Sequence, residues 1–82
     1  MKEKIIDGVE YGIIRVKLRE ELSRKKISIN KLSKLTGIKY DVIKRYFVGN
    51  IYRIDLDVLA KICYVLECDI ENLLEYSNGE NR

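Results

Sequence analysis

Apolar residues recur at helical spacing along most of this chain, and the strict alternation typical of a strand is scarce. Ile14, Leu18 and Leu22 follow one another every four residues with charged residues between them. This spacing places the three side chains on one face of a helix. It therefore predicts a first amphipathic helix over residues 12–26.

Local signals predict the ends of the next two helices. Ser28 precedes Leu32 and Leu35, and its hydroxyl suits an N-cap because it can accept a free backbone N–H. Gly37 suits the left-handed position that follows a helix. The second helix is short and stops at Gly37. Only Gly37, Ile38 and Lys39 separate it from a third helix over 40–47, and a Gly-Asn turn signal ends that helix.

Two further helices are expected in the C-terminal half. Asp55 is the predicted cap of the first, and Asp69 is the predicted cap of a short last one. The side chains expected to face inward from these two helices are Leu59, Ile62, Cys63 and Leu66, followed by Ile70, Leu73 and Leu74. The pattern predicts an all-α, compact five-helix domain over 12–76, with an N-terminal extension over 1–11 and a frayed polar tail over 77–82.

Composition excludes several classes of function. The chain has 82 residues and no histidine, which rules out Ser-His and Cys-His nucleophiles and histidine-bound metals. No apolar run is long enough to span a membrane. Its two cysteines, Cys63 and Cys68, lack the C-x-x-C spacing of a zinc or redox site. We therefore expect no enzyme, no metal, no cofactor and no membrane partner, and a cytoplasmic location.

The charge is distributed unevenly. Residues 1–53 hold 14 Lys/Arg against 6 Asp/Glu, a net of +8, whereas residues 54–82 hold 2 against 7, a net of −5. The overall +3 thus predicts one basic and one acidic surface. A basic surface favours a polyanionic partner, nucleic acid before membrane. Ordinary solvated helix faces are the alternative explanation of the same charges.

The third predicted helix has two chemically different faces. Two short helices joined by a three-residue turn with glycine have the geometry of a helix-turn-helix, whose second helix enters the major groove. On this helix Val42, Ile43, Tyr46 and Phe47 share the apolar side, and the polar side carries Tyr40, Asp41, Lys44 and Arg45. Arginine and lysine can donate to guanine, and aspartate can accept from cytosine. The polar side is therefore predicted to read bases.

The segment 27–39, ISINKLSKLTGIK, resembles the Cro/repressor-type (xenobiotic-response-element-like) helix-turn-helix family. The resemblance continues through Ile43 and Gly49 to DLDVLAKIC at 55–63 and LECDIENLLE at 66–75, so it covers about residues 13–76. It implies a five-helix lambda-repressor-like domain of bacterial, phage or mobile-element origin. Such a domain binds double-stranded operator DNA, usually as a homodimer on a palindromic site, and represses transcription.

The resemblance also implies roles for individual residues. Base contact falls on Tyr40, Asp41, Lys44 and Arg45. Phosphate contact falls on Ser28, Ile29 (through its backbone N–H), Asn30, Lys39, Asn50, Tyr52 and Arg53. Two positions depart from the family pattern. Lys39 replaces the usual Ser or Thr, which predicts a third helix without a side-chain N-cap, and Val48 replaces a polar residue, which predicts an exposed apolar side chain near the DNA.

A second class of function stays open at this point. A domain of this fold can act as a protein-interaction module, such as an antitoxin or anti-repressor, because fold alone does not fix function. The apolar residues of the N-terminal extension, Ile5, Ile6 and Val9, would then form the contact. For a homodimer the candidate surfaces are that extension and the fifth helix around Leu74 and Tyr76. No small-molecule ligand is expected, and Tyr64 and Tyr76 are predicted to lie at the edge of the core.

Overall fold

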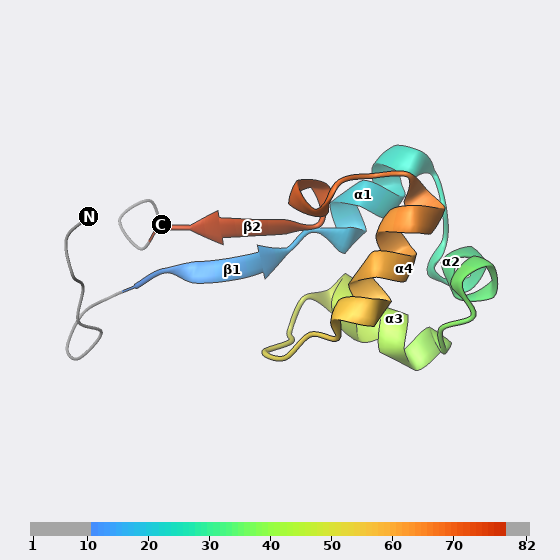
Figure 1. Ribbon diagram of the computed structural model, residues 1–82, viewed down its shortest axis with the longest axis horizontal. Coiled ribbons are helices and arrows are strands. Elements are labelled where there is room, and N and C mark those ends of the chain that lie inside the picture. The colour runs from blue at the N-terminus through green and yellow to red at the C-terminus, as the bar shows by residue number, and fades with distance from the viewer. Residues whose placement is uncertain (1–10, 79–82) are drawn as a thin grey trace.

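The protein folds as a four-helix body from which a two-stranded antiparallel sheet projects along the long axis of the molecule (Figure 1). The computed structural model describes residues 11–78. The helices are α1 (Leu18–Lys25), α2 (Ile29–Thr36), α3 (Tyr40–Val48) and α4 (Leu56–Leu66). The strands are β1 (Ile13–Val16) and β2 (Leu74–Ser77), and a short 3-10 turn, η1 (Ile70–Asn72), precedes β2. No helix in this part of the chain is long and apolar enough to cross a membrane.

The sheet replaces two segments that were predicted to be helical. Residues 13–16 form β1 instead of the start of the first helix, and the fifth helix is reduced to η1 followed by β2. The domain therefore has four α-helices in the described residues and is not purely α-helical. Ser77, assigned to the frayed tail from the sequence, pairs with Ile13 in the sheet. The rest of the N-terminal extension, residues 1–10, and residues 79–82 of the tail lie outside the described residues.

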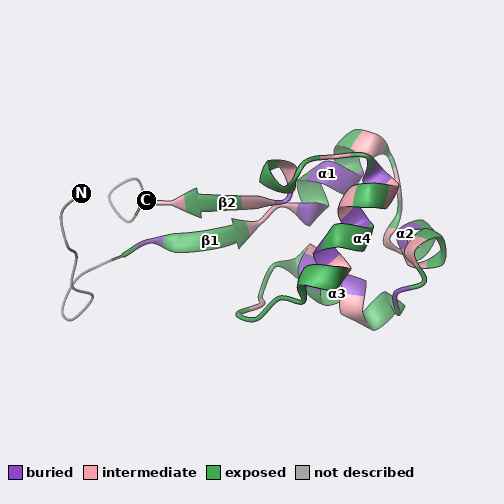
Figure 2. Ribbon diagram, in the orientation of Figure 1, coloured by how far each residue is buried: buried purple, intermediate pink, exposed green. Residues whose placement is uncertain are grey.

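The core lies where the four helices meet (Figure 2). The predicted inward residues Leu18, Leu22, Leu59, Ile62 and Leu66 are all buried, which confirms the helical pattern of α1 and α4. Leu73 is buried as well. Two residues that were predicted to face inward are instead exposed, because Ile14 lies on the sheet and Ile70 lies on the 3-10 turn. Tyr64 and Tyr76, which were predicted to lie at the edge of the core, are largely exposed as well.

The predicted ends of α2 and the predicted start of α4 are confirmed. The Ser28 hydroxyl accepts from the Lys31 N–H at 3.0 Å, and the Asp55 carboxylate accepts from the Asp57 N–H at 2.8 Å. Gly37 has a φ of +76°, the left-handed conformation that costs glycine little. Local sequence signals therefore set the boundaries of α2 and the start of α4.

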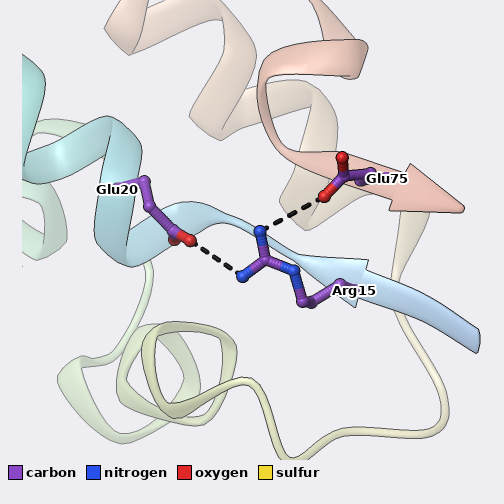
Figure 3. A network of polar contacts seen from close by, with 3 residues as sticks. All are labelled: Arg15, Glu20 and Glu75. Carbon is purple, nitrogen blue, oxygen red and sulfur yellow. Dashed lines mark hydrogen bonds and ion pairs between the residues drawn. The ribbon is translucent and has the colours of Figure 1, made fainter. Parts of the chain in front are cut away.

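The base of the sheet is tied to the helical body by Arg15 (Figure 3). Its guanidinium donates to Glu20 of α1 at 2.8 Å and to Glu75 of β2 at 3.2 Å. The hydrogen bond from Arg15 is the main cause that lowers the pKa of the Glu20 carboxyl. All three side chains are about half exposed, and each such pair contributes little to stability alone. Arg15 thus links α1 to β2, while Val16 and Leu74 pack the base of the sheet against the core and the Lys17 N–H donates to the Leu73 carbonyl at 2.7 Å.

Candidate nucleic-acid interface

The turn between α2 and α3 is held by side-chain hydrogen bonds. The Ser33 hydroxyl donates to the Ile38 carbonyl at 2.6 Å, and the Thr36 hydroxyl accepts from the Ile38 N–H at 3.2 Å. Ile38 itself is buried in the core. The backbone N–H and carbonyl of Ile38, the central residue of the turn 37–39, are therefore both hydrogen-bonded to side chains of α2. These two bonds set the orientation of α3 relative to α2. This is the helix-turn-helix that the sequence predicts.

The structure gives α3 the two faces that its sequence predicts. Ile43 and Tyr46 are buried, and Val42 and Phe47 pack against the core at its edge. The opposite side is exposed along its length, and its members are Tyr40, Asp41, Lys44 and Arg45. A helix held by its apolar side presents these four side chains to a partner without rearrangement of the core.

Several predicted contact residues meet in shallow surface hollows beside α3. One hollow is lined by Asp41, Lys44, Arg45, Val48 and Asn50. Arg45 and Asn50 also border a neighbouring open depression together with Tyr52 and Arg53. The structure therefore brings three predicted base-contacting residues next to three predicted phosphate-contacting residues of the loop after α3.

That loop is anchored to α3 from inside. The Tyr46 hydroxyl accepts from the Asp55 N–H at 2.8 Å, and the Tyr46 side chain is buried. Ile51 packs against the core from the same loop. The exposed Tyr52 and Arg53 between these two anchors are consequently held close to the C-terminal end of α3.

The predicted phosphate contacts at the start of α2 form a separate cluster. Ser28, Ile29 and Asn30 stand at the helix N-terminus, where helix geometry leaves the first N–H groups without an intrahelical acceptor. Ser28 and Ile29 line a hollow with Arg19 and Lys26. The hollow beside Ser28 and Ile29 is lined by other residues than the two hollows beside Arg45.

In the part of the chain that the structure describes, the cations of α2, α3 and the following loop form no ion pair. Within residues 11–78 the ion pairs involve Arg15, Arg24 and Lys61. None of these belongs to α2, α3 or residues 49–55. Unpaired cations can replace the counterions of a nucleic-acid backbone, so this surface is electrostatically suited to phosphate.

Comparison with known proteins identifies the family. Residues 17–79 match the family model described as the Cro/C1-type HTH DNA-binding domain. The chain belongs to this family. A curated relative, described as an SPbeta prophage-derived uncharacterized HTH-type transcriptional regulator, YopS of Bacillus subtilis (strain 168), is 37% identical over 59 residues, which cover 68% of this chain and 77% of that protein.

Solved structures share the fold of this Cro/C1-type domain. A candidate DNA-binding protein from Bacteroides fragilis matches with a TM-score of 0.67 and 21% identity, over 77% of this chain and 100% of that one. The transcriptional regulator VanUg matches with a TM-score of 0.65 and 21% identity, over 94% of this chain and 99% of that one. The helix-turn-helix described above is therefore embedded in a known architecture.

Both departures from the family pattern have the structural consequences expected from the sequence. Lys39 occupies the N-cap position of α3 with extended backbone angles and forms no side-chain capping hydrogen bond. Val48 is exposed and lines the hollow that contains Lys44 and Arg45. This Cro/C1-type domain thus carries an uncapped candidate recognition helix with an apolar side chain at its far end.

One candidate contact was missed from the sequence. The Arg19 guanidinium of α1 stacks over the Phe47 ring of α3 at 4.8 Å from its centroid, beside the N-terminus of α2. The only sequence signal that favoured Arg19 as a contact was the excess of positive charge in the N-terminal half of the chain. The pairing of Arg19 with Phe47 depends on how α1 packs on α3, which spacing along the chain does not show.

Proposed function

We propose that this protein is a sequence-specific transcriptional regulator that inserts α3 into the major groove of an operator and represses transcription in the bacterial cytoplasm. The observation that carries the proposal is the exposed polar face of α3, bordered by cations without ion-pair partners. We assign base contact to Tyr40, Asp41, Lys44 and Arg45. Phosphate contact is assigned to Ser28, Ile29, Asn30, Lys39, Asn50, Tyr52 and Arg53.

The proposal includes a homodimer on a palindromic site. An α-helix of nine residues, the length of α3, reaches only a few base pairs, and a genome offers a very large number of competing sites. Two copies related by a two-fold axis read two half-sites about 34 Å apart, one turn of DNA. The dimer is therefore supported by a functional argument: a single α3 contacts too few base pairs to distinguish one operator from the rest of a genome.

Two arginines separate base reading from phosphate binding. A random DNA pool is first selected for sequences bound by the wild-type protein, and the affinity of variants for the selected duplex is then measured at several salt concentrations. Arg45→Ala is expected to lower specific affinity by about 5- to 150-fold and to relax selection at one position. Arg53→Ala is expected to weaken binding to all sequences alike and to reduce the salt slope by about 1.

A matched control is the exposed cation Lys61, which pairs with Asp57 on α4 at 3.0 Å. Like the two arginine variants, Lys61→Ala removes one positive charge, but outside the candidate interface. It is therefore expected to leave the DNA affinity and the selected sequence unchanged. An unchanged affinity of Arg45→Ala for the selected duplex would contradict the assignment of α3 as the reading helix. Failure of the wild-type protein to enrich any sequence would contradict sequence-specific binding as a whole.

A further inference from the structure

The two-stranded sheet has one apolar and one polar face. Residues directly opposite in an antiparallel pair point to the same side of the sheet. The pairs Ile14–Tyr76 and Val16–Leu74 therefore share a face without any charge. The pairs Ile13–Ser77 and Arg15–Glu75 form the other face, where Arg15 and Glu75 bond to one another.

The outer half of the apolar face is uncovered. Val16 and Leu74 pack against the core, whereas Ile14 is 68% and Tyr76 is 63% exposed. Figure 2 shows the strands beyond the helical body as largely exposed. Within the described residues β1 pairs with β2 alone, so each strand also has an unpaired outer edge. Isolated two-stranded sheets are marginal in water and are stabilised by a further partner.

We propose that this apolar face docks on the same face of a second copy of the chain. A two-fold interface places one patch against itself, and the face formed by Ile14, Tyr76, Val16 and Leu74 can meet its copy without bringing like charges together. A charged partner would find no complementary charge on this face. The sheet also projects from the helical body, away from α3 (Figure 1). Docking through it leaves both copies of α3 uncovered.

The size of the patch indicates a weak dimer. With Ile14 and Tyr76 about two-thirds exposed, the patch offers roughly 250 Å² per copy by the usual areas of such side chains. A stable interface buries about 800 Å² per partner. The free protein is therefore mostly monomeric at low concentration. On DNA, adjacent half-sites hold two copies at an effective concentration near the millimolar range, which is sufficient for a weak contact to act.

Neighbouring isoleucines on opposite faces of β1 provide a matched pair of variants. Ile14→Lys places an ammonium in the proposed interface, and Ile13→Lys places the same group on the other face of the same strand. Both positions are well exposed, so both variants are expected to keep the wild-type thermal midpoint. Sedimentation equilibrium of the full chain is measured from about 10 μM to about 1 mM, a range suited to weak interfaces.

The wild-type protein and Ile13→Lys are expected to form a reversible dimer in this range. The dissociation constant of Ile14→Lys is expected to be higher by about tenfold or more, because an unpaired charge would be buried. A wild-type protein that stays monomeric at the highest concentration overturns the proposal. An Ile14→Lys variant that dimerises like the wild type overturns it as well.

A DNA measurement separates this inference from the proposed function, on which its role at an operator rests. The wild type and both variants are titrated against the selected palindromic duplex and against a single half-site. We expect Ile14→Lys to lose affinity for the palindrome and to retain affinity for the half-site. Equal two-copy binding by Ile14→Lys and Ile13→Lys overturns the dimer surface and leaves DNA binding intact. If the wild type binds neither duplex, the proposed function fails, while sedimentation still decides the dimer.

Discussion

The start of α3 offers a test in which stability and DNA binding should change in opposite directions. Lys39 occupies the N-cap position with φ −61° and ψ 143° and forms no side-chain capping bond. These extended angles are the ones an N-cap residue adopts. Lys39→Ser would therefore place a hydroxyl where it can accept a backbone N–H from the first turn of α3. The substitution also removes a positive charge from the positive end of the helix dipole.

The expected gain in the free energy of unfolding is about 0.5–1 kcal/mol, the lower part of the range for N-caps. The lower part applies because Asp41 already lies in the first turn of α3 and interacts favourably with the same dipole. For a domain of this size such a gain raises the melting temperature by roughly 2–8 °C. Thermal unfolding followed by circular dichroism measures it directly.

The same substitution should weaken DNA binding, because Lys39 is one of the proposed phosphate contacts. Loss of one such contact reduces the slope of log affinity against log salt by about 0.9. Lys39→Ala is the matched control: it removes the same charge and adds no hydroxyl. If Lys39→Ser is no more stable than Lys39→Ala, the missing cap does not limit α3. If both variants keep the wild-type salt slope, Lys39 does not contact phosphate.

Two other perturbations test the loop anchor and the end of α4. Tyr46→Phe removes the acceptor of the Asp55 N–H and is expected to lower the free energy of unfolding, measured by chemical denaturation, by about 1 kcal/mol. It should also weaken binding to all DNA sequences alike. An unchanged free energy of unfolding would show that the bond does not hold the loop. Burial raises the pKa of the Cys68 thiol from 9.0 to about 11, so the folded state retains this proton more strongly than the unfolded state. The contribution of the Cys68 thiol to the free energy of unfolding is therefore fully present below pH 9.0 and is lost towards pH 11, by up to about 2 kcal/mol. Denaturant curves at pH 8.5, 10 and 11 should show a steeper loss of stability in the wild type than in Cys68→Ala. Parallel losses would show that Cys68 does not cause the pH dependence.

The helices that could be predicted from sequence are those whose ends are fixed by nearby residues. Ser28 and Gly37 bound α2, and Asp55 starts α4, each through a hydrogen bond or a backbone angle set within a few positions. Such signals depend only on local geometry. The two-faced pattern of α3 is equally local, because the helix repeat alone decides which side chains share a side.

The sheet could not be predicted in the same way. Ile14 lies four residues before Leu18 and so fits the helical spacing of α1, although it belongs to β1. A strand of four residues is too short for alternation to compete with that pattern. Its partner lies about sixty positions away, as the contact between Arg15 and Glu75 shows. Gly12 shows the same long-range constraint: a Cβ there would lie 2.3 Å from the Ser77 carbonyl oxygen.

In the candidate interface, too, some residues could be identified from local sequence signals and others only from contacts between distant segments. The exposed residues of α3 were available from the sequence, whereas the neighbourhood of Arg45, Asn50 and Arg53 depends on the buried Tyr46 bond. Arg19 was hidden because its partner Phe47 belongs to another helix. Helical spacing therefore identified the candidate residues of α3, the family resemblance supplied the proposed phosphate contacts, and tertiary packing decides which of them lie together.

The small net charge of this protein is compatible with a strongly polar surface at α3. Acidic groups of α1, β2 and α4 are held by Arg15, Arg24 and Lys61, so part of the opposing charge is neutralised away from α3. Asp41 is the exception, since its exposed carboxylate shares a hollow with Lys44 and Arg45. A carboxylate repels phosphate and can accept from the amino group of cytosine. If α3 reads bases as proposed, the cations around Asp41 favour any DNA, whereas Asp41 favours only DNA that places a suitable base beneath it.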